Sequence, residues 1–218
     1  MFRRRVDDLI APLVGLALLI VCGVLASSSE VGPVELSVFH AVNGMPDVLS
    51  PVMRVSQLLG ILVVGPIVSC VALLLRKWRL ALAALIVTGA KLAGERAVWH
   101  FVQRSRPGTT IADAIVRGGS PTQGVSFVSG HVVLVSGLAW VITPYLRGWW
   151  RVVPWLVVLL VAFARVYLGA HAPLDVVGGC ALGVVIGGLT NLIVGVPEHP
   201  RSSALLIPTS NEEPPVRS

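Results

Sequence analysis

Long apolar segments constrain this chain more than any other feature of its sequence. We identify six of them, at 9–26, 55–75, 80–102, 125–146, 152–168 and 173–196. Each is close to the ~20 residues that a helix needs to cross the hydrocarbon core of a bilayer. Backbone polar groups must be satisfied internally in lipid, so such spans are expected to be helical. The sequence therefore predicts an all-α polytopic membrane protein built as a bundle of six transmembrane helices.

The composition favours a membrane domain over a soluble one. Hydrophobic residues make up 55% of the chain and charged residues 13%, with a mean hydropathy of +0.83. Basic side chains gather in short loops between the spans and form no face interleaved with aromatic residues, so the net charge of +6 does not predict nucleic-acid binding. The three cysteines lie inside apolar spans without metal-ligand spacing, and we expect neither a disulfide framework nor a metal site.

We expect one membrane domain with short flanking segments. Residues 1–8 form a basic N-terminus, 9–196 the six-span domain, and 197–218 a tail rich in Pro, Ser and Glu that is expected to be disordered. The basic start followed by an apolar run could also be a signal peptide. Because 9–26 contains 18 uncharged residues, longer than a usual signal core, we prefer a retained first helix.

The distribution of Arg and Lys predicts the orientation of the chain. Most of these residues precede the first span or follow the second, fourth and sixth spans, which places them on one side of the membrane. The positive-inside rule assigns that side, and with it both termini, to the cytoplasm. The connections 27–54, 103–124 and 169–172 are then expected to lie outside the cell membrane.

Three short motifs lie at the outer ends of the predicted spans. They are Arg106-Pro107, Ser129-Gly130-His131, and Arg165 followed by His171 and Asp175. Any one of them could be a snorkelling charge or a hydrogen-bonded histidine without further function. Ionisable residues at membrane depth are costly, however, and three such motifs on one face of the membrane indicate a functional site.

The residue types in these motifs are suited to phosphate chemistry. His171 and Asp175 are four residues apart, so on a helix the carboxylate can orient the imidazole and leave its other nitrogen free to attack. Arg165 offers a forked donor for phosphate oxygens. These residues predict cleavage of a bound phosphate through a phospho-histidine.

The other two motifs add anion binding and acid catalysis. Gly130 permits close backbone approach at a helix N-terminus, where N–H groups bind anions, and Ser129 adds a hydroxyl donor. His131 is placed to act as general acid for the leaving oxygen. Pro107 ends the preceding helix and would direct Arg106 toward the same site.

In this order, the motifs resemble the signature of the type-2 phosphatidic acid phosphatase superfamily of integral-membrane lipid phosphatases. That signature runs Lys-x6-Arg-Pro, Pro-Ser-Gly-His and Ser-Arg-x5-His-x3-Asp, and the resemblance covers 35–190. It implies that His171 is the nucleophile, His131 the general acid and Asp175 the orienting partner of His171. It also implies that phosphate is bound by Arg106, Ser129, Gly130 and Arg165, and that the reaction requires no metal and no cofactor.

Three positions depart from the signature. Val128 and Ala164 replace a Pro and a Ser that do no covalent chemistry, whereas Trp99 replaces the Lys of the first motif. The candidate replacements for that cation are Arg96, His100, Lys91 and Arg104. We place Arg96 first, because Lys91 would lie only ~16 Å along a helix from residue 80, near the middle of the bilayer. Lys91 or Arg96 could instead simply pair with Glu95.

The resemblance implies hydrolysis of a lipid phosphate or diphosphate at the outer leaflet. A polyprenyl diphosphate carrier is the favoured substrate, with phosphatidic acid and phosphatidylglycerol phosphate as alternatives. Transfer of the phosphate to a sugar or lipid acceptor, or a non-catalytic lipid-binding role, also stay open. The expected partners are the substrate and membrane lipids, and the sequence does not specify an oligomeric state.

Overall fold

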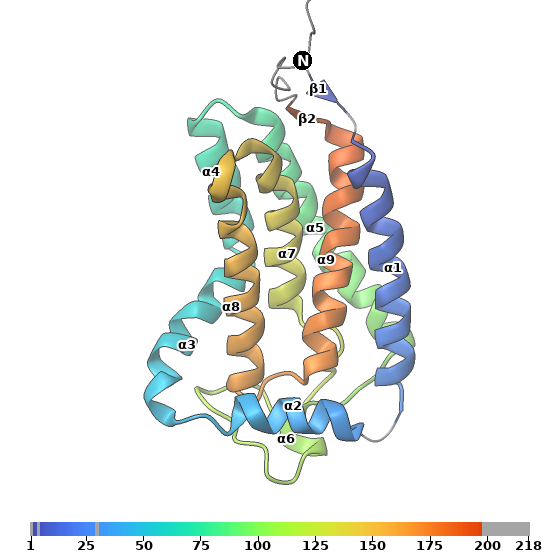
Figure 1. Cartoon of the computed structure of the whole chain (residues 1–218), viewed down its shortest axis with the longest axis vertical. Coiled ribbons are helices and arrows are strands. Elements are labelled where there is room, and N and C mark those ends of the chain that lie inside the picture. Colours follow the sequence, from blue (N-terminus) through green and yellow to red (C-terminus); the bar gives the residue numbers. More distant parts are fainter. Residues whose placement is uncertain (1, 4, 29–30, 198–218) are drawn as a thin grey trace, which may run out of the picture.

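The computed structural model describes residues 2–3, 5–28 and 31–197, and nearly all of its regular structure is helical. Five long helices lie along one axis of the molecule (Figure 1). They are α1 (Asp7–Ala26), α5 (Trp78–Phe101), α7 (Gly130–Ile142), α8 (Val153–Tyr167) and α9 (Pro173–Val194). From residue 198 onward, the tail predicted to be disordered lies outside the described residues.

The chain runs back and forth between two ends of this bundle (Figure 1). At the end that we call the terminal end, the antiparallel pair β1 (Phe2–Arg3) and β2 (Val196–Pro197) joins the start of the chain to the segment after α9. At the opposite end, which we call the site end, α2 (Pro33–Asn43) lies across the bundle beside the short α6 (Pro107–Thr110). The first and last described segments, 2–3 and 196–197, are thus at the same end of the bundle.

The segment predicted as a continuous span at 55–75 is broken in the structure. The 3-10 turn η1 (Asp47–Leu49) leads into α3 (Ser50–Ser56) and a second 3-10 turn, η2 (Gln57–Gly60), before α4 (Val64–Leu74) begins. The two parts are bent by 64°. At the bend η2 packs against α7, where a Cβ on Gly60 would lie 2.7 Å from the Cβ of His131. The break therefore brings η2 to the edge of the predicted site.

Among the described residues, three helical segments are long and apolar enough to cross a membrane. They are Asp7–Ala26, Gly148–Tyr167, which joins η4 (Gly148–Arg151) to α8, and Pro173–Val194; the bent pair 47–60 and 64–74 would be a fourth. Helix α5 is long enough to span a membrane but carries charged residues. Helix α7 is shorter, because it begins only at Gly130, after the extended Ser129. The prediction of a mostly helical membrane fold is confirmed, whereas the count of six spans stays a prediction.

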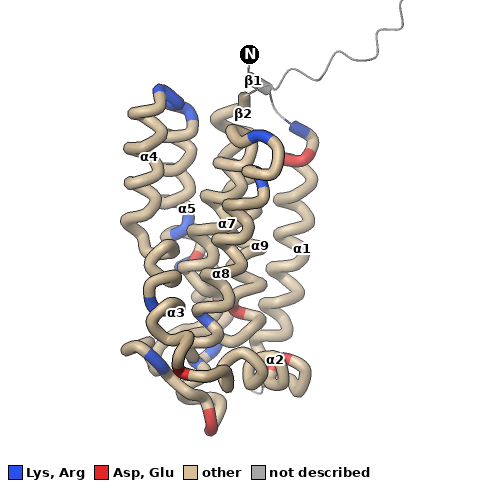
Figure 2. Tube along the Cα trace, turned by 60° about the vertical axis from the view of Figure 1, so that its left-hand side comes forward, with Lys and Arg blue, Asp and Glu red and all other residues tan. Residues whose placement is uncertain are grey.

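Helix α9 is central to the packing, with α1, α5 and α7 against it. Small residues allow α7 and α9 to approach closely, since a side chain at Gly183 would clash with the Ser136 hydroxyl. Close packing of this kind holds helices together where lipid removes most of the hydrophobic driving force between them. Apolar side chains on the outer faces of α1 and α4 are exposed, among them Leu13 and Leu74. Figure 2 shows charged positions at the two ends and, between them, beside α5.

Candidate active site

The connection between α8 and α9 carries the predicted nucleophile. Gly169 adopts a left-handed backbone (φ +71°), which turns the chain out of α8 four residues after Arg165. Helix α9 then begins at Pro173, in the first-turn position that proline favours. His171 lies in this tight connection and is almost fully buried, with 3% of its surface exposed.

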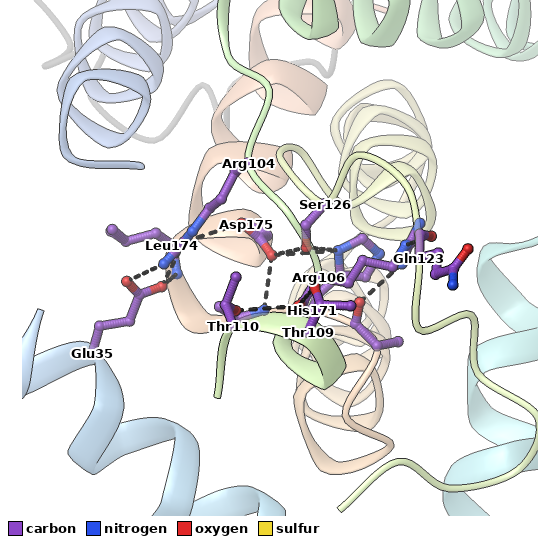
Figure 3. Close-up of polar contacts among 12 residues, drawn as sticks. Glu35, Arg104, Arg106, Thr109, Thr110, Gln123, Ser126, His171, Leu174 and Asp175 are labelled. Atoms are coloured by element: carbon purple, nitrogen blue, oxygen red, sulfur yellow. Dashed lines mark hydrogen bonds and ion pairs between the residues drawn. The ribbon is translucent and has the colours of Figure 1, made fainter. Parts of the chain in front are cut away.

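Asp175 and Ser126 hold one side of the His171 ring (Figure 3). The Asp175 Oδ2 lies 3.6 Å from His171 Nδ1, and it accepts a hydrogen bond from the Ala172 backbone N–H at 2.8 Å. The Ser126 Oγ lies 3.3 Å from the same Nδ1 and donates to Asp175 Oδ2. A proton on Nδ1 can therefore be shared with Ser126 and Asp175, which leaves Nε2 as the nitrogen free to attack.

The surroundings of His171 favour its neutral form. Burial lowers the pKa of His171, and although the hydrogen bond and charge of Asp175 act in the opposite direction, burial prevails. Only a neutral imidazole has the lone pair that nucleophilic attack requires. The surroundings of His171 therefore favour the protonation state that a nucleophile needs.

Two guanidinium groups border the site beside His171. Arg106 donates to the Gln123 carbonyl at 3.1 Å and to the Ala170 carbonyl at 2.9 Å, and burial lowers its pKa. Arg165 is held by the side-chain oxygen of Gln57 on η2. The Nε of Arg165 is buried and has no hydrogen-bond partner among the described residues, so it is available to an anion.

The N-terminus of α7 forms another wall of the site. Ser129 caps the helix, and its buried Oγ has no hydrogen-bond partner within the part of the chain that the structure describes. A side chain at Gly130 would clash with the Glu95 carboxylate, so glycine is required for this close approach. Unpaired donors next to a helix N-terminus are suited to binding an anion.

Several of these groups border one cavity of about 400 Å³, whereas Ser126, Ser129 and Asp175 lie behind its lining. His131, His171, Arg106 and Arg165 all line it, as does Gly130. The remaining lining residues come from η2 and the turn after it, from one face of α5, and from the extended segments before α7: Gln57, Leu58, Ile61, Lys91, Glu95, Trp99, Gly118, Gly119, Ser120, Pro121, Val125 and Val128. The structure thus brings all three sequence motifs to one cavity at the site end of the bundle.

The candidate replacements for the missing Lys lie in different places. Lys91 lines the cavity, where its Nζ lies 2.7 Å from Glu95 Oε2. Arg96 and His100, of which the sequence placed Arg96 first, are exposed and do not line it. The reason is helical geometry: residues 91, 95 and 99 recur every four positions and share one face of α5, whereas residue 96 is rotated by about 100° from residue 95.

Arg104, the fourth candidate, faces away from the cavity. It forms ion pairs with Glu35 and Asp175 behind the nucleophile. Burial alone would lower the pKa of Arg104, but the two carboxylates prevail and raise it. Arg104 is therefore a positively charged partner of Asp175 and does not line the cavity.

Three further residues contact the candidate site residues without any signal in the sequence. Ser126, Gln57 and Glu35 touch His171, Arg165 and Arg104, respectively. Ser126 precedes the Ser-Gly-His motif by three residues, and Gln57 was masked by the apolar run in which it lies. Contacts between distant segments bring these residues to the site, and no spacing along the chain marks them.

The donor set does not resemble a metal centre. Within the described residues, no group of three or more His, Cys, Asp or Glu side chains is arranged to hold a metal ion. The ionisable residues that border the cavity are instead two arginines, a lysine and two histidines, together with one carboxylate that pairs with the lysine. Such a set is suited to binding an anionic group directly.

Comparisons with known proteins identify a family and two similar folds. The sequence model of the PAP2 superfamily matches residues 76–196. The fold is similar to the crystal structure of Aquifex aeolicus LpxE, with a TM-score of 0.64 and 22% identity over 74% of this chain and 96% of that one. It is also similar to the first transmembrane PAP2-type phosphatidylglycerolphosphate phosphatase from Bacillus subtilis, with a TM-score of 0.65 and 24% identity over 82% of this chain and 94% of that one. The comparison with curated proteins finds no match.

Proposed function

Since the chain belongs to the PAP2 superfamily, we propose that it hydrolyses a lipid phosphate or diphosphate through a phospho-histidine on His171, without a metal. One observation carries this proposal: His171, held at Nδ1 by Ser126 and Asp175, borders the same cavity as His131 and two arginines. The superfamily's solved structures named above are consistent with a membrane phosphatase.

The first step forms the phospho-enzyme. The Nε2 lone pair of His171 attacks phosphorus, a nitrogen–phosphorus bond forms, and the bond to the leaving oxygen breaks with its electron pair. His131 gives a proton to that oxygen, so the lipid leaves as an alcohol or as a monophosphate. Arg106, Arg165 and the α7 N-terminus stabilise the charge on the transferring phosphoryl group.

The second step regenerates the enzyme. His131, now neutral, takes a proton from water, whose oxygen attacks phosphorus and displaces Nε2 of His171. Inorganic phosphate leaves, and both histidines return to their starting states. Asp175 keeps the proton on Nδ1 of His171 throughout, which orients the ring and stabilises the positive charge of the phospho-imidazole.

We favour a polyprenyl diphosphate as the substrate over phosphatidic acid or phosphatidylglycerol phosphate. The cavity has three cationic side chains, Arg106, Arg165 and Lys91, which are suited to the larger charge of a diphosphate. On the η2 side the wall contains Leu58 and Ile61, which cannot hydrogen bond with a glycerol headgroup. A lipid with two phosphates and few other polar groups fits these walls better than a glycerolipid.

Lys91 is proposed to supply the cation that the superfamily signature places at position 99. It lies on the same face of α5 as Trp99, two helical turns farther from the site end. Glu95 holds its ammonium group in the cavity, beside Gly130. An incoming phosphate can compete with Glu95 for this ammonium group.

Removing the ammonium group is expected to weaken substrate binding. We expect Lys91→Met, combined with Glu95→Gln so that no carboxylate is left unpaired, to lower kcat/KM by about tenfold to a hundredfold, mainly through KM. Adding Trp99→Lys to this double variant should restore most of the loss. Steady-state kinetics measure both effects, with Arg96→Met as the control. Equal losses in the Lys91 and Arg96 variants would contradict the role of Lys91.

The site end is proposed to face the outside of the cell membrane, with both termini in the cytoplasm. Basic residues after α4 and in η4, such as Arg76 and Arg151, support this orientation. In a version of the chain without its native cysteines, Asp113→Cys at the site end should react with an impermeant maleimide in intact cells. Arg151→Cys should react only after permeabilisation, and the reverse pattern would invert the orientation.

Phosphate release from a panel of lipids tests the function. The purified protein in detergent and EDTA would receive a polyprenyl diphosphate, phosphatidic acid or phosphatidylglycerol phosphate. We expect release from the diphosphate at the highest kcat/KM. Loss of substrate without release of inorganic phosphate would instead indicate transfer to an acceptor. No reaction with any lipid would indicate a relative that binds lipid without catalysis.

A further inference from the structure

We propose that Arg104 and Glu35 are positioning residues for the nucleophile: together they fix the Asp175 carboxylate from behind and set the charge that His171 experiences. Glu35 belongs to α2, so the pair also connects the helix that lies across the site end with the reacting imidazole. The inference rests on the proposed function, because it assigns a role in the same reaction. Neither residue borders the cavity or would touch the substrate.

Four charged or titratable side chains, Glu35, Arg104, Asp175 and His171, contact one another in a row (Figure 3). Arg104 Nη1 donates to Asp175 Oδ1 at 3.2 Å, whereas Oδ2 of the same carboxylate faces Ser126 and His171. Arg104 also donates to both oxygens of Glu35, at 2.9 and 2.7 Å. The side chains of Arg104, Glu35 and Asp175 are at most 8% exposed. Because these side chains are so buried, solvent screens their charges little.

Glu35 also contacts the start of α9 directly. Its Oε1 accepts a hydrogen bond from the Leu174 backbone N–H at 2.9 Å, one residue before Asp175. A carboxylate at a helix N-terminus satisfies an otherwise free N–H and interacts favourably with the helix dipole. Glu35 therefore fixes both the guanidinium that holds Asp175 and the helical turn that carries it.

The charges of Arg104 and Glu35 are expected to have opposite effects on the pKa of His171. Arg104 offsets the negative charge of Asp175, and Glu35 in turn offsets part of the charge of Arg104. Without Arg104, two carboxylates would remain behind His171 and favour its protonation. Without the charge of Glu35, the full charge of Arg104 would act and oppose protonation.

Other groups around His171 are the same in all these variants. Ser126 precedes α7, Arg165 comes from α8, Arg106 precedes α6, and His131 comes from α7. Their contributions therefore cancel when variants of Arg104 and Glu35 are compared. A purely structural ion pair would lower stability or activity on removal, but it would not move the titration of His171 in opposite directions.

The test compares Arg104→Met with Glu35→Gln. We expect the pKa of His171 to rise by about one unit in the first variant and to fall by about half a unit in the second. Arg104→Lys, which keeps the charge, should stay near wild type. The acid limb of the pH profile of kcat/KM should shift in the same directions as the titration.

Two readouts separate this proposal from the proposed function. Nuclear magnetic resonance of the labelled His171 ring, assigned with His171→Gln, follows the titration whether or not the protein hydrolyses a lipid. Arg117→Met is the matched control, because Arg117 is also buried at the site end and pairs with Asp47, away from Asp175. Opposite shifts support the proposal even if no lipid is cleaved. An unchanged titration of His171 in Arg104→Met and Glu35→Gln would overturn the proposal even if hydrolysis is observed. Shifts of the same sign in these two variants and in Arg117→Met would do so as well.

If Arg104→Met does not fold, the comparison of Glu35→Gln with Arg104→Lys remains. Glutamine has nearly the shape of glutamate, so the Glu35 variant should retain the packing of α2. A fall of the His171 pKa in Glu35→Gln with no change in Arg104→Lys supports the role of the charge. Equal pKa values of His171 in Glu35→Gln, Arg104→Lys and wild type would exclude this role of the charge.

Discussion

Replacement of His171 with Gln is expected to lower the release of inorganic phosphate by at least about a thousandfold, because the atom that attacks phosphorus is lost. The substitution removes a ring that lines the cavity but leaves Arg106, Arg165 and the α7 N-terminus in place. Binding of substrate should therefore survive the loss of turnover. Phosphate release under multiple-turnover conditions measures the first effect, and retention of a lipid phosphate by the inactive protein measures the second.

His100→Gln is the matched control for this variant. His100 is exposed on α5, does not border the cavity and contacts the ring of Phe101. Its replacement should leave turnover within about twofold of wild type, as is usual for surface substitutions. Comparable losses in the two variants, or turnover in His171→Gln above a few per cent of wild type, would exclude His171 as the nucleophile.

The second large effect is expected at His131. In His131→Gln no general acid meets the leaving oxygen, so cleavage of phosphatidic acid should slow by about a hundredfold to ten-thousandfold. Cleavage of 4-nitrophenyl phosphate should slow far less at the first step, because its phenolate leaves without a proton. The rates of leaving-group release in the first turnover, each relative to wild type, give the comparison. The ratio of the two losses measures the acid role alone.

The same variant is also expected to change the second step. His131 takes a proton from water when the phospho-enzyme is hydrolysed, so His131→Gln should accumulate phospho-His171 with the aryl substrate. Rapid mixing would then show a burst of nitrophenolate followed by a slow steady state. Equal losses with both substrates and no burst would assign His131 to phosphate binding and not to proton transfer.

The residues that line the cavity were easier to predict from the sequence than the path of the chain. Arg106, His131, Arg165 and His171 all line the cavity as expected, since motifs at the ends of helices depend on local signals that spacing reveals. The bend at residues 60–64 was not predicted, because a uniformly apolar run does not distinguish a straight helix from a broken one. The family resemblance is confirmed by the match to residues 76–196.

Contacts between distant segments account for what the sequence could not reveal. Glu35 and Arg104 are separated by 69 positions, and Arg165 and Gln57 by 108, so neither pair leaves a local pattern. Lys91 was judged too far from the outer surface, but the cavity reaches it along the face of α5 that carries Glu95 and Trp99. Depth along a helix was thus a weaker guide than the face on which a residue lies.

Detection of the phosphorylated residue tests the central claim most directly. The wild-type protein would be mixed with a radiolabelled lipid phosphate or diphosphate in EDTA, quenched in base within milliseconds, digested and sequenced by mass spectrometry. The account predicts a base-stable, acid-labile phosphate on the peptide that contains His171, which forms and decays at rates compatible with turnover and is absent from His171→Gln. Phosphate released at the full rate without such a peptide, or a phosphate found on another residue, would contradict it.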